Sequence, residues 1–360
     1  MVLCVIDLME QLVMFKNIFM LMIVSIVVSC SNNAEEITTP AINKRKKAPR
    51  ISTLYKSGSY NLRINYIILH YTALDDDMSL KVLTDPGVSS HYLITTRANE
   101  PIYKLVDDTN RAWHAGITMY QNRYSINDSS VGIEIVNLGY IQKVTNTPQQ
   151  LARMNKRQLE NLYFTPYDEY LEYDESQIEK AAYLLNELID KYGVRPYNIL
   201  GHSDIAPYRK KDPGPKFPWK RLYDEYNLGI WYDEEDYSNF MMSNDYRRAT
   251  VMDIKNEFIK YGYTSMPTNN VWDYESRKVL YAFQCRFRTN DIDGNIDKET
   301  YSIARALNLK VKKLNEAYER SKANNFLTNT FFTNIFISNN IVNNNWDYMH
   351  TNKNIIMRRK

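Results

Sequence analysis

Short apolar runs rich in β-branched residues alternate with longer segments along much of this 360-residue chain, and this alternation limits the fold more than any other feature. Residues 64–71 (INYIILHY) and 131–136 (VGIEIV) have the character of buried strands. Residues 174–192 instead repeat apolar side chains at helical spacing, and a short strand begins soon afterwards at Ile199. Strands that alternate with helices predict an α/β domain with a mainly buried sheet.

Two further strands are predicted between these runs, at residues 91–95 and 102–106. The polar stretch 97–101 between them suits a hairpin turn. Residues 141–170 interrupt the pattern with a polar segment. We expect this segment to be an insertion and assign it no structure.

The predicted helix over residues 174–192 has signals at both ends. Ser176 and Glu179 match a capping box, in which two side chains satisfy the free amides of the first turn. Gly193 stands where a helix stop belongs, because glycine readily adopts the left-handed conformation of a C-cap. We therefore expect a helix over residues 174–192 that stops at Gly193.

The C-terminal part of the chain predicts helices rather than strands. Residues 244–262, 273–287 and 297–307 each have a helical pattern. We predict a small three-helix domain over residues 233–312. The Asn-rich remainder lacks a clear period, so we expect a poorly ordered tail over residues 313–360.

The N-terminal segment has the anatomy of a secretion signal. An apolar run at residues 18–28 is too short to span a bilayer comfortably and suits the core of a signal peptide. It ends in VVSC, which resembles a bacterial lipobox whose cysteine, here Cys30, becomes lipidated. We expect a signal peptide over residues 1–30 and a polar linker over residues 31–50. A simple membrane anchor or a cleaved secretory signal is the alternative.

Lipidation would attach the protein to a membrane through its N-terminus. Ser31 after Cys30 resembles the sorting pattern of outer-membrane lipoproteins, so we expect an anchored protein that faces the periplasm. Acidic residues before Met14 suit a signal start poorly, and we expect translation to begin at Met14. Cys285 would then be the only unmodified cysteine, which excludes an intramolecular disulfide.

The overall charge gives no reason to expect a nucleic-acid partner. Lys and Arg total 45 against 42 Asp and Glu, a net charge of +3, and no long basic stripe is present. Hydrophobic content is 44% and charged content 24%, as in ordinary folded proteins. We expect a folded monomer that does not bind nucleic acid.

The histidines are the residues best suited to carry chemistry. His70 ends a predicted buried strand, where an unpaired polar ring is costly. His202 opens residues 201–215 (GHSDIAPYRKKDPGP), whose Pro and Gly predict a rigid loop of the kind that carries binding residues. With Asp212 of the same loop, the two imidazoles could supply the ligands of a catalytic zinc ion, with a fourth position left for water. The distant spacing alone is a weak signal, and hydrogen-bonded core histidines are the alternative.

Five sequence blocks strengthen the metal interpretation. The stretch GHSDIAPYRKKDPGPKFPW is preceded, in order, by ILHYT, SSHYLI, RAWHAG and VGIEIVN. Together the blocks closely resemble the type 2 amidase family of zinc N-acetylmuramoyl-L-alanine amidases, in its lipoprotein branch, over about residues 50–230. The resemblance implies a catalytic domain over residues 51–232 with a mixed central sheet flanked by helices. It also implies hydrolysis of the amide bond between N-acetylmuramic acid and L-alanine in peptidoglycan or its fragments.

The resemblance implies a role for each matching residue. His70, His202 and Asp212 would hold Zn²⁺, which makes hydroxide available near neutral pH. Glu134 would act as the general base that moves the proton of water to the leaving amine. Lys210 would stabilise the oxyanion as the carbonyl becomes tetrahedral.

Each of these roles has a simpler alternative. Glu134 on an apolar strand can be a buried acid paired with a neighbour, and Lys210 can be a solvated member of a basic run. Trp113 and His114 lie in the block that the family places beside the substrate, so we expect them to bind substrate, with core packing as the alternative. His91 is expected to be a core residue or a partner of a metal ligand rather than a ligand.

The C-terminal helices contain motifs, such as YGY at residues 261–263 and DGNIDKET at 293–300, that resemble a three-helix peptidoglycan-binding module. The expected partners are therefore peptidoglycan or muropeptides, while the alternative is a helical appendage that only packs on the amidase. Two other functions stay open, namely a non-catalytic peptidoglycan-binding lipoprotein and a structural tether between membrane and wall. The full set of metal and catalytic residues favours the enzyme.

Overall fold

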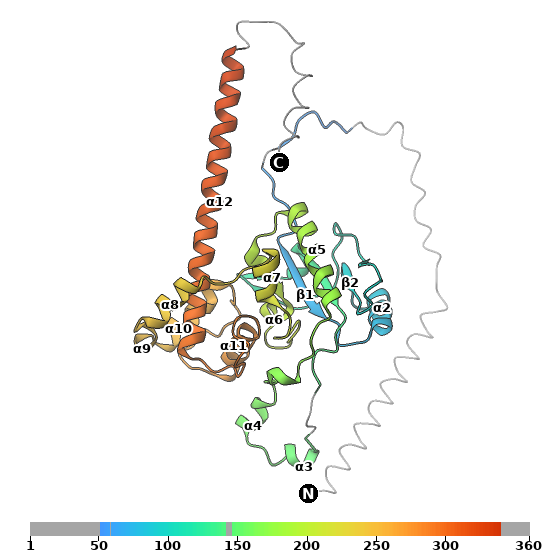
Figure 1. Cartoon of the computed structure of the whole chain (residues 1–360), viewed down its shortest axis with the longest axis vertical. Coiled ribbons are helices and arrows are strands. Elements are labelled where there is room, and N and C mark those ends of the chain that lie inside the picture. The colour runs from blue at the N-terminus through green and yellow to red at the C-terminus, as the bar shows by residue number, and fades with distance from the viewer. Residues whose placement is uncertain (1–50, 58, 142–145, 340–360) are drawn as a thin grey trace, which may run out of the picture. The chain divides into compact units, whose positions relative to one another are not determined.

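The computed structural model describes residues 51–339 except residue 58 and residues 142–145 (Figure 1). The predicted signal peptide with Cys30, the predicted linker at residues 31–50 and the last residues, 340–360, lie outside the described part. From Asn61 onward the described residues form one compact unit, and those before it belong to a separate unit. Among the described helices, none combines the length and the hydrophobicity that crossing a bilayer requires.

Five strands form one mixed sheet in the order β3-β2-β6-β1-β7. β1 lies between β6 and β7 and runs parallel to both, β2 runs parallel to β6, and β3 pairs antiparallel with β2. The predicted mixed sheet and hairpin are thereby confirmed. The strands are Tyr66–Tyr71 (β1), Tyr92–Ile94 (β2), Tyr103–Lys104 (β3), Ser130–Ile135 (β6) and Ile199–Gly201 (β7), and a separate ladder joins Met119–Tyr120 (β4) to Arg123–Tyr124 (β5).

The central strand β1 contributes to two cores, because successive residues of a strand point to opposite faces of the sheet. Ile67 and Leu69 pack in the large core that includes the buried residues of α5 (Glu175–Tyr192). Ile68 belongs to a second core on the other face, together with Leu200 of β7. The same alternation places His70 on the face of Ile68, away from α5.

Helix α5 is the predicted long helix, but its N-terminal cap differs from the prediction. The capping box uses Asp174 and Gln177, whose side chain accepts a hydrogen bond of 3.1 Å from the amide of Asp174. The prediction based on Ser176 and Glu179 was therefore wrong by two residues, because the earlier Asp-x-x-Gln pattern satisfies the same free amides. Gly193 ends the helix with a φ of 63°, as predicted.

The polar segment after β6, left without a structure from the sequence, contains two short helices. α3 (Pro148–Leu151) and α4 (Lys156–Asn161) each begin with a capping box. The remaining helices of the α/β part are α2 (Asp76–Thr84), α6 (His202–Ile205), α7 (Trp219–Tyr226) and the 3-10 turns Ile126–Ser129, Tyr167–Glu169 and Pro196–Asn198.

Within the described residues five helices follow the α/β part, and Figure 1 shows α8, α9, α10 and α11 gathered around the base of α12. The structure differs from the predicted irregular tail over residues 313–360, since α12 continues to Asn339. Strong helix formers such as Leu, Lys, Glu and Ala favour the continuation of α12 beyond residue 307. Lys312 also pairs with Glu316 one turn later, which stabilises the helix. The helices are α8 (Glu234–Met242), α9 (Asp245–Arg248), α10 (Val251–Tyr261), α11 (Tyr274–Phe287) and α12 (Lys298–Asn339).

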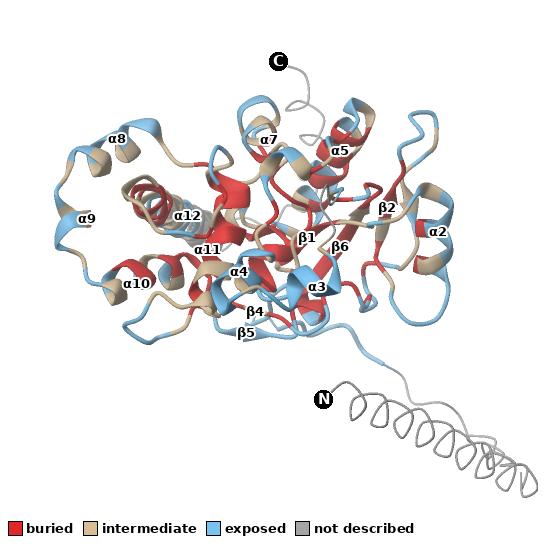
Figure 2. Ribbon diagram, turned by 90° about the horizontal axis from the view of Figure 1, so that it is seen from below, coloured by how far each residue is buried: buried red, intermediate tan, exposed pale blue. Residues whose placement is uncertain are grey.

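The C-terminal helices share a core with the sheet. Phe258 of α10 and Phe283 of α11 are buried in the same cluster as Leu222 of α7 and Ile199 of β7. Figure 2 shows buried residues running from β1 and β6 into α11 and α10. The domain boundary predicted between residues 232 and 233 stays a prediction. Residues from both sides of it pack in this core.

Candidate metal centre

His70 and Glu134 lie side by side on neighbouring strands. They are register partners in the parallel pair of β1 and β6, and both side chains point to the face of the sheet opposite α5. Glu134 Oε1 lies 3.9 Å from His70 Nδ1. The His70 side chain is only 1% exposed, so its ring must find partners within the protein.

His202 and Asp212 come from the loop that follows β7. His202 begins α6, and the amide of Ser203 donates to the carbonyl of Asp212 at 2.9 Å, which closes the loop. Gly201 permits this fold, because a Cβ there would lie 2.6 Å from Cδ of Pro213. The predicted rigid loop thus brings both residues beside the end of β1.

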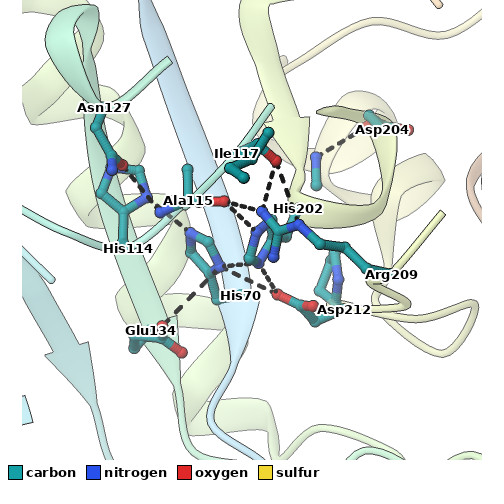
Figure 3. Close-up of polar contacts among 12 residues, drawn as sticks. His70, His114, Ala115, Ile117, Asn127, Glu134, His202, Asp204, Arg209 and Asp212 are labelled. Carbon is teal, nitrogen blue, oxygen red and sulfur yellow. Dashed lines mark hydrogen bonds and ion pairs between the residues drawn. The ribbon is translucent and has the colours of Figure 1, made fainter. Parts of the chain in front are cut away.

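Three donor atoms converge at this point (Figure 3). His70 Nδ1 and His202 Nδ1 are 2.9 Å apart, and Asp212 Oδ2 is 3.0 Å from each of them. All three residues are buried. Ligands about 2.0–2.1 Å from a tetrahedral zinc ion lie about 3.3 Å apart, so a small outward movement would make room for zinc. Two imidazoles and one carboxylate are also a donor set of catalytic zinc sites.

Hydrogen bonds at Nε2 of His202 and His70 favour the tautomer whose Nδ1 lone pair can bind a metal. His202 Nε2 donates to the carbonyl of Ala115 at 3.0 Å, which leaves the lone pair on Nδ1. When His70 Nδ1 is a metal ligand, its ring proton is on Nε2, 3.0 Å from His114 Nδ1. His114 then accepts that proton at Nδ1 and donates from Nε2 to Ser130 Oγ at 3.1 Å. Such partners fix the orientation and basicity of metal ligands.

The ring of His114 lies directly over Gly132 of β6. A Cβ at residue 132 would be 2.5 Å from Cγ of His114, so only glycine leaves room for the ring. The neighbouring His91 accepts from the Gly132 amide at 3.0 Å and donates to the carbonyl of Asn110 at 3.3 Å. His91 is therefore a structural residue, and its donor atoms do not join the metal cluster.

The charge states of the cluster also suit a cation. Burial and the neighbouring His202 lower the pKa of His70 to about 4, so its ring is neutral at neutral pH. Burial opposes ionisation of Asp212, but the His202 and His70 rings outweigh it and hold the pKa of that carboxyl well below its usual range. A neutral His70 ring and an ionised Asp212 carboxylate suit the binding of a divalent ion.

Glu134 has an unsatisfied carboxylate oxygen beside the cluster. Its Oε2 is buried and has no hydrogen-bond partner among the residues that the structure describes. Burial and the charge of Asp212 raise the pKa of Glu134 well above its usual range, while the charge of Lys210 opposes the shift. A carboxylate with a raised pKa and a free oxygen is suited to take up a proton.

A cavity of about 170 Å³ opens beside these residues. Lys210 lines it, as do His114 and Trp113. Trp113 is 59% exposed and forms part of the rim, which suits the predicted contact with substrate. His114 was also predicted on the substrate side; it lines the cavity, and both of its ring nitrogens have protein partners. The cavity is lined by His70, Tyr71, Thr72, Leu74, Ser79, Val82, Leu83, Val88, Ser89, Trp113, His114, Glu134, His202, Lys210 and Asp212.

Several supporting residues were not found from the sequence. Ser130 and Gly132 precede Glu134 at intervals of two, so strand alternation alone could have placed all three on one face. Arg209 donates to the carbonyls of Ala115 and Ile117 and so holds the segment that carries the His202 acceptor. Nothing in the sequence pattern pairs Arg209 with that distant segment.

Known proteins resemble the chain over the region that carries these residues. Residues 60–215 match the family described as N-acetylmuramoyl-L-alanine amidase. N-acetylmuramoyl-L-alanine amidase AmiD of Escherichia coli is 33% identical over 268 residues, which cover 73% of this chain and 88% of AmiD.

Solved structures show the same similarity. The complex of Escherichia coli AmiD with the substrate anhydro-N-acetylmuramic acid-L-Ala-D-gamma-Glu-L-Lys matches with a TM-score of 0.60 and 33% identity, over 72% of this chain and 94% of that one. The crystal structure of AmpDH3 from Pseudomonas aeruginosa matches with a TM-score of 0.61 and 34% identity, over 73% of this chain and 98% of that one. From the extent of these matches and the geometry of the site, the chain belongs to the N-acetylmuramoyl-L-alanine amidase family.

Proposed function

We propose that the protein is a zinc-dependent amidase that hydrolyses the amide bond between N-acetylmuramic acid and L-alanine in peptidoglycan or its fragments. The single observation that carries this proposal is the convergence of three buried donor atoms next to the free oxygen of Glu134. A protein that only bound peptidoglycan would have no need to keep both the donor set and an unpaired carboxylate in one cavity.

The donor distances and the charges of His70 and Asp212 support zinc as the metal. His70, His202 and Asp212 would hold the ion, which when bound supplies a Lewis acid and lowers the pKa of water. The chain itself must still move a proton and orient the substrate. These tasks belong to the other residues that line the cavity.

Glu134 is the proposed general base. Its free Oε2 removes a proton from the attacking water as the water oxygen bonds to the carbonyl carbon of the scissile amide. The same carboxyl then gives that proton to the nitrogen of L-alanine as the carbon–nitrogen bond breaks. Water is consumed, and the products are a free muramyl carboxylate and a free peptide amine.

Lys210 is the proposed electrostatic partner of the reacting carbonyl. It lines the cavity that Glu134 and the donor residues share. Its ammonium group would stabilise the negative oxygen that forms as the carbonyl becomes tetrahedral. Trp113 at the rim would offer a flat apolar surface to the sugar or peptide.

The family and two relatives support a proposal for the substrate class. AmiD was solved with an anhydromuramyl tripeptide and AmpDH3 with an anhydromuramic pentapeptide. We propose the same class, muramyl peptides with an N-terminal L-alanine, for this chain. We also propose lipidation at Cys30, an outer-membrane protein that faces the periplasm, and a monomeric enzyme.

Product analysis tests the catalytic proposal. Protein lacking residues 1–30 is incubated with a muramyl tripeptide, with a zinc chelator, and with chelator followed by excess Zn²⁺. Mass spectrometry should show free tripeptide that disappears with chelator and returns with zinc. A folded, zinc-loaded protein that binds the muramyl tripeptide without releasing tripeptide would favour the non-catalytic alternative.

A separate experiment tests the anchor. Full-length protein and a Cys30→Ala variant are expressed with a labelled fatty acid in a bacterium with two membranes. We expect label only on the protein with Cys30, and recovery of that protein in the outer-membrane fraction. Label on both proteins, or on neither, would contradict lipidation at Cys30.

A further inference from the structure

The metal loop contains a second buried carboxylate that takes no part in the donor cluster. Asp204 lies two residues after His202 in α6 and is 1% exposed. Its Oδ2 accepts a hydrogen bond of 2.8 Å from the amide of Gly201, the residue directly before His202. Asp204 therefore fixes the backbone turn that aims the His202 ring.

The charge of Asp204 is balanced by a residue from the C-terminal helices. Arg286 of α11 is buried, and its Nη1 donates to Asp204 Oδ2 at 2.8 Å. Its Nη2 donates to the carbonyl of Ile199 at 2.9 Å, at the start of β7. The guanidinium also lies 4.1 Å over the ring of Trp219. One side chain thus holds both the strand before His202 and the helix that His202 begins.

The turn after α10 supplies a second contact to the same carboxylate. Tyr263 is 1% exposed, and its hydroxyl donates to Asp204 Oδ1 at 2.5 Å. The same turn also reaches the α/β part through Gly262, whose carbonyl accepts from the amide of Gln121 at 2.9 Å. Both oxygens of Asp204 therefore have donors from the C-terminal helices.

We propose that Arg286 is a positioning residue for the metal ligand His202, acting through Asp204 and β7 with the support of Tyr263. The C-terminal helices then support the metal centre through Asp204 and β7. The inference rests on the proposed zinc site, because its consequence is the affinity of that site for zinc.

Electrostatics and geometry explain why loss of Arg286 would weaken zinc binding. Arg286 is the one cation paired with Asp204 among the described residues. A buried carboxylate that loses such a partner is strongly unfavourable, so the loop would move or admit water. Partners that orient a metal ligand typically change metal affinity by about 10-fold to 100-fold when they are removed. Arg286 acts one step further from the ligand, so we expect its removal to lower zinc affinity by about 10-fold.

The test compares zinc affinity in two variants of the full mature chain, measured by competition with a chelator of known affinity. Arg286→Met removes the charge beside Asp204. Arg305→Met is the matched control, because Arg305 also pairs with an aspartate, Asp245, and lies 4.1 Å over an aromatic ring, Phe240, in the same helices but away from the metal loop. We expect weaker zinc binding by about 10-fold for the first variant and wild-type affinity for the second.

The outcomes separate the two proposals. If the wild-type chain does not bind zinc, the proposed function fails. If the wild type binds zinc and Arg286→Met binds it equally well, the positioning role is overturned. Should Arg286→Met fail to fold, the double variant Asp204→Asn with Arg286→Met removes both charges and retains a neutral acceptor. Loss of zinc affinity in the folded double variant supports the role, and wild-type affinity overturns it.

Discussion

His114 and His70 are joined through their rings, with His114 Nδ1 lying 3.0 Å from His70 Nε2. The contact lies on the side of His70 opposite the metal donors, so it sets which nitrogen of His70 carries the proton. Ser130 Oγ at 3.1 Å completes the chain by accepting from His114 Nε2. The buried residues His114 and Ser130 thus support the metal ligand His70 from the β6 side.

Replacing His114 with Phe should weaken zinc binding by about 10-fold to 100-fold, because His70 loses the acceptor that holds its proton on Nε2. His114→Asn keeps a short side chain with an acceptor oxygen and should retain more affinity. Chelator competition measures both variants. Equal zinc affinity in wild type and His114→Phe would show that the ring only packs in the core.

Replacing Gly132 with Ala should displace the His114 ring, since the added Cβ would lie 2.5 Å from its Cγ. We expect a loss of about 1–3 kcal/mol in the free energy of unfolding, as for other overpacked cores, together with weaker zinc binding. Gly193→Ala is the control, because it strains a left-handed C-cap with a φ of 63° that is far from the site. That variant should lose stability and keep zinc affinity. Unchanged zinc binding in a folded Gly132→Ala variant would argue against the proposed support of His70.

Replacing Glu134 with Gln should lower kcat by about 10²-fold to 10⁴-fold, because the neutral amide cannot accept the proton of water. Zinc affinity should change little, since the donor cluster consists of His70, His202 and Asp212. Glu172→Gln, at an acid 71% exposed, is the matched control and should keep wild-type kcat. Steady-state hydrolysis of a muramyl tripeptide measures the effect. A Glu134→Gln enzyme with wild-type kcat would remove Glu134 from the mechanism.

The sequence predicted the sheet because strand patterns follow local rules, whereas the metal donors came from local patterns and the resemblance together. Strand alternation places His70 on the same face as Ile68, and the Pro and Gly of the loop after β7 force a rigid turn that carries His202 and Asp212. The resemblance to the amidases then selected these residues among all possible ligands. Their convergence to within about 3 Å needed the structure.

What the sequence did not predict depends on contacts between distant segments. Arg286 and Asp204 lie in separate predicted elements, and no periodicity links them. The partners of His114 also come from β1 and β6, so its ring was expected beside substrate and not behind a metal ligand. The capping box at Asp174 was missed for a different reason, since two overlapping capping patterns compete within a few residues.

Asp108 gives a test of stability away from the metal. It is buried and accepts hydrogen bonds from Tyr92, Lys191 and Tyr192, which outweigh burial and lower its pKa to about 2. Because the folded pKa lies below the unfolded value, the stabilisation is present above about pH 4 and lost as pH falls towards 2. After solvent screening we expect Asp108→Asn to cost about 1–2 kcal/mol of unfolding free energy at pH 7, and progressively less below pH 4. The control is Asp190→Asn, at an exposed aspartate of α5. It should lower the free energy of unfolding by less than about 0.5 kcal/mol. Urea unfolding from pH 7 to 3 measures both variants, and a cost for Asp108→Asn that does not decrease in acid would contradict the ionic role.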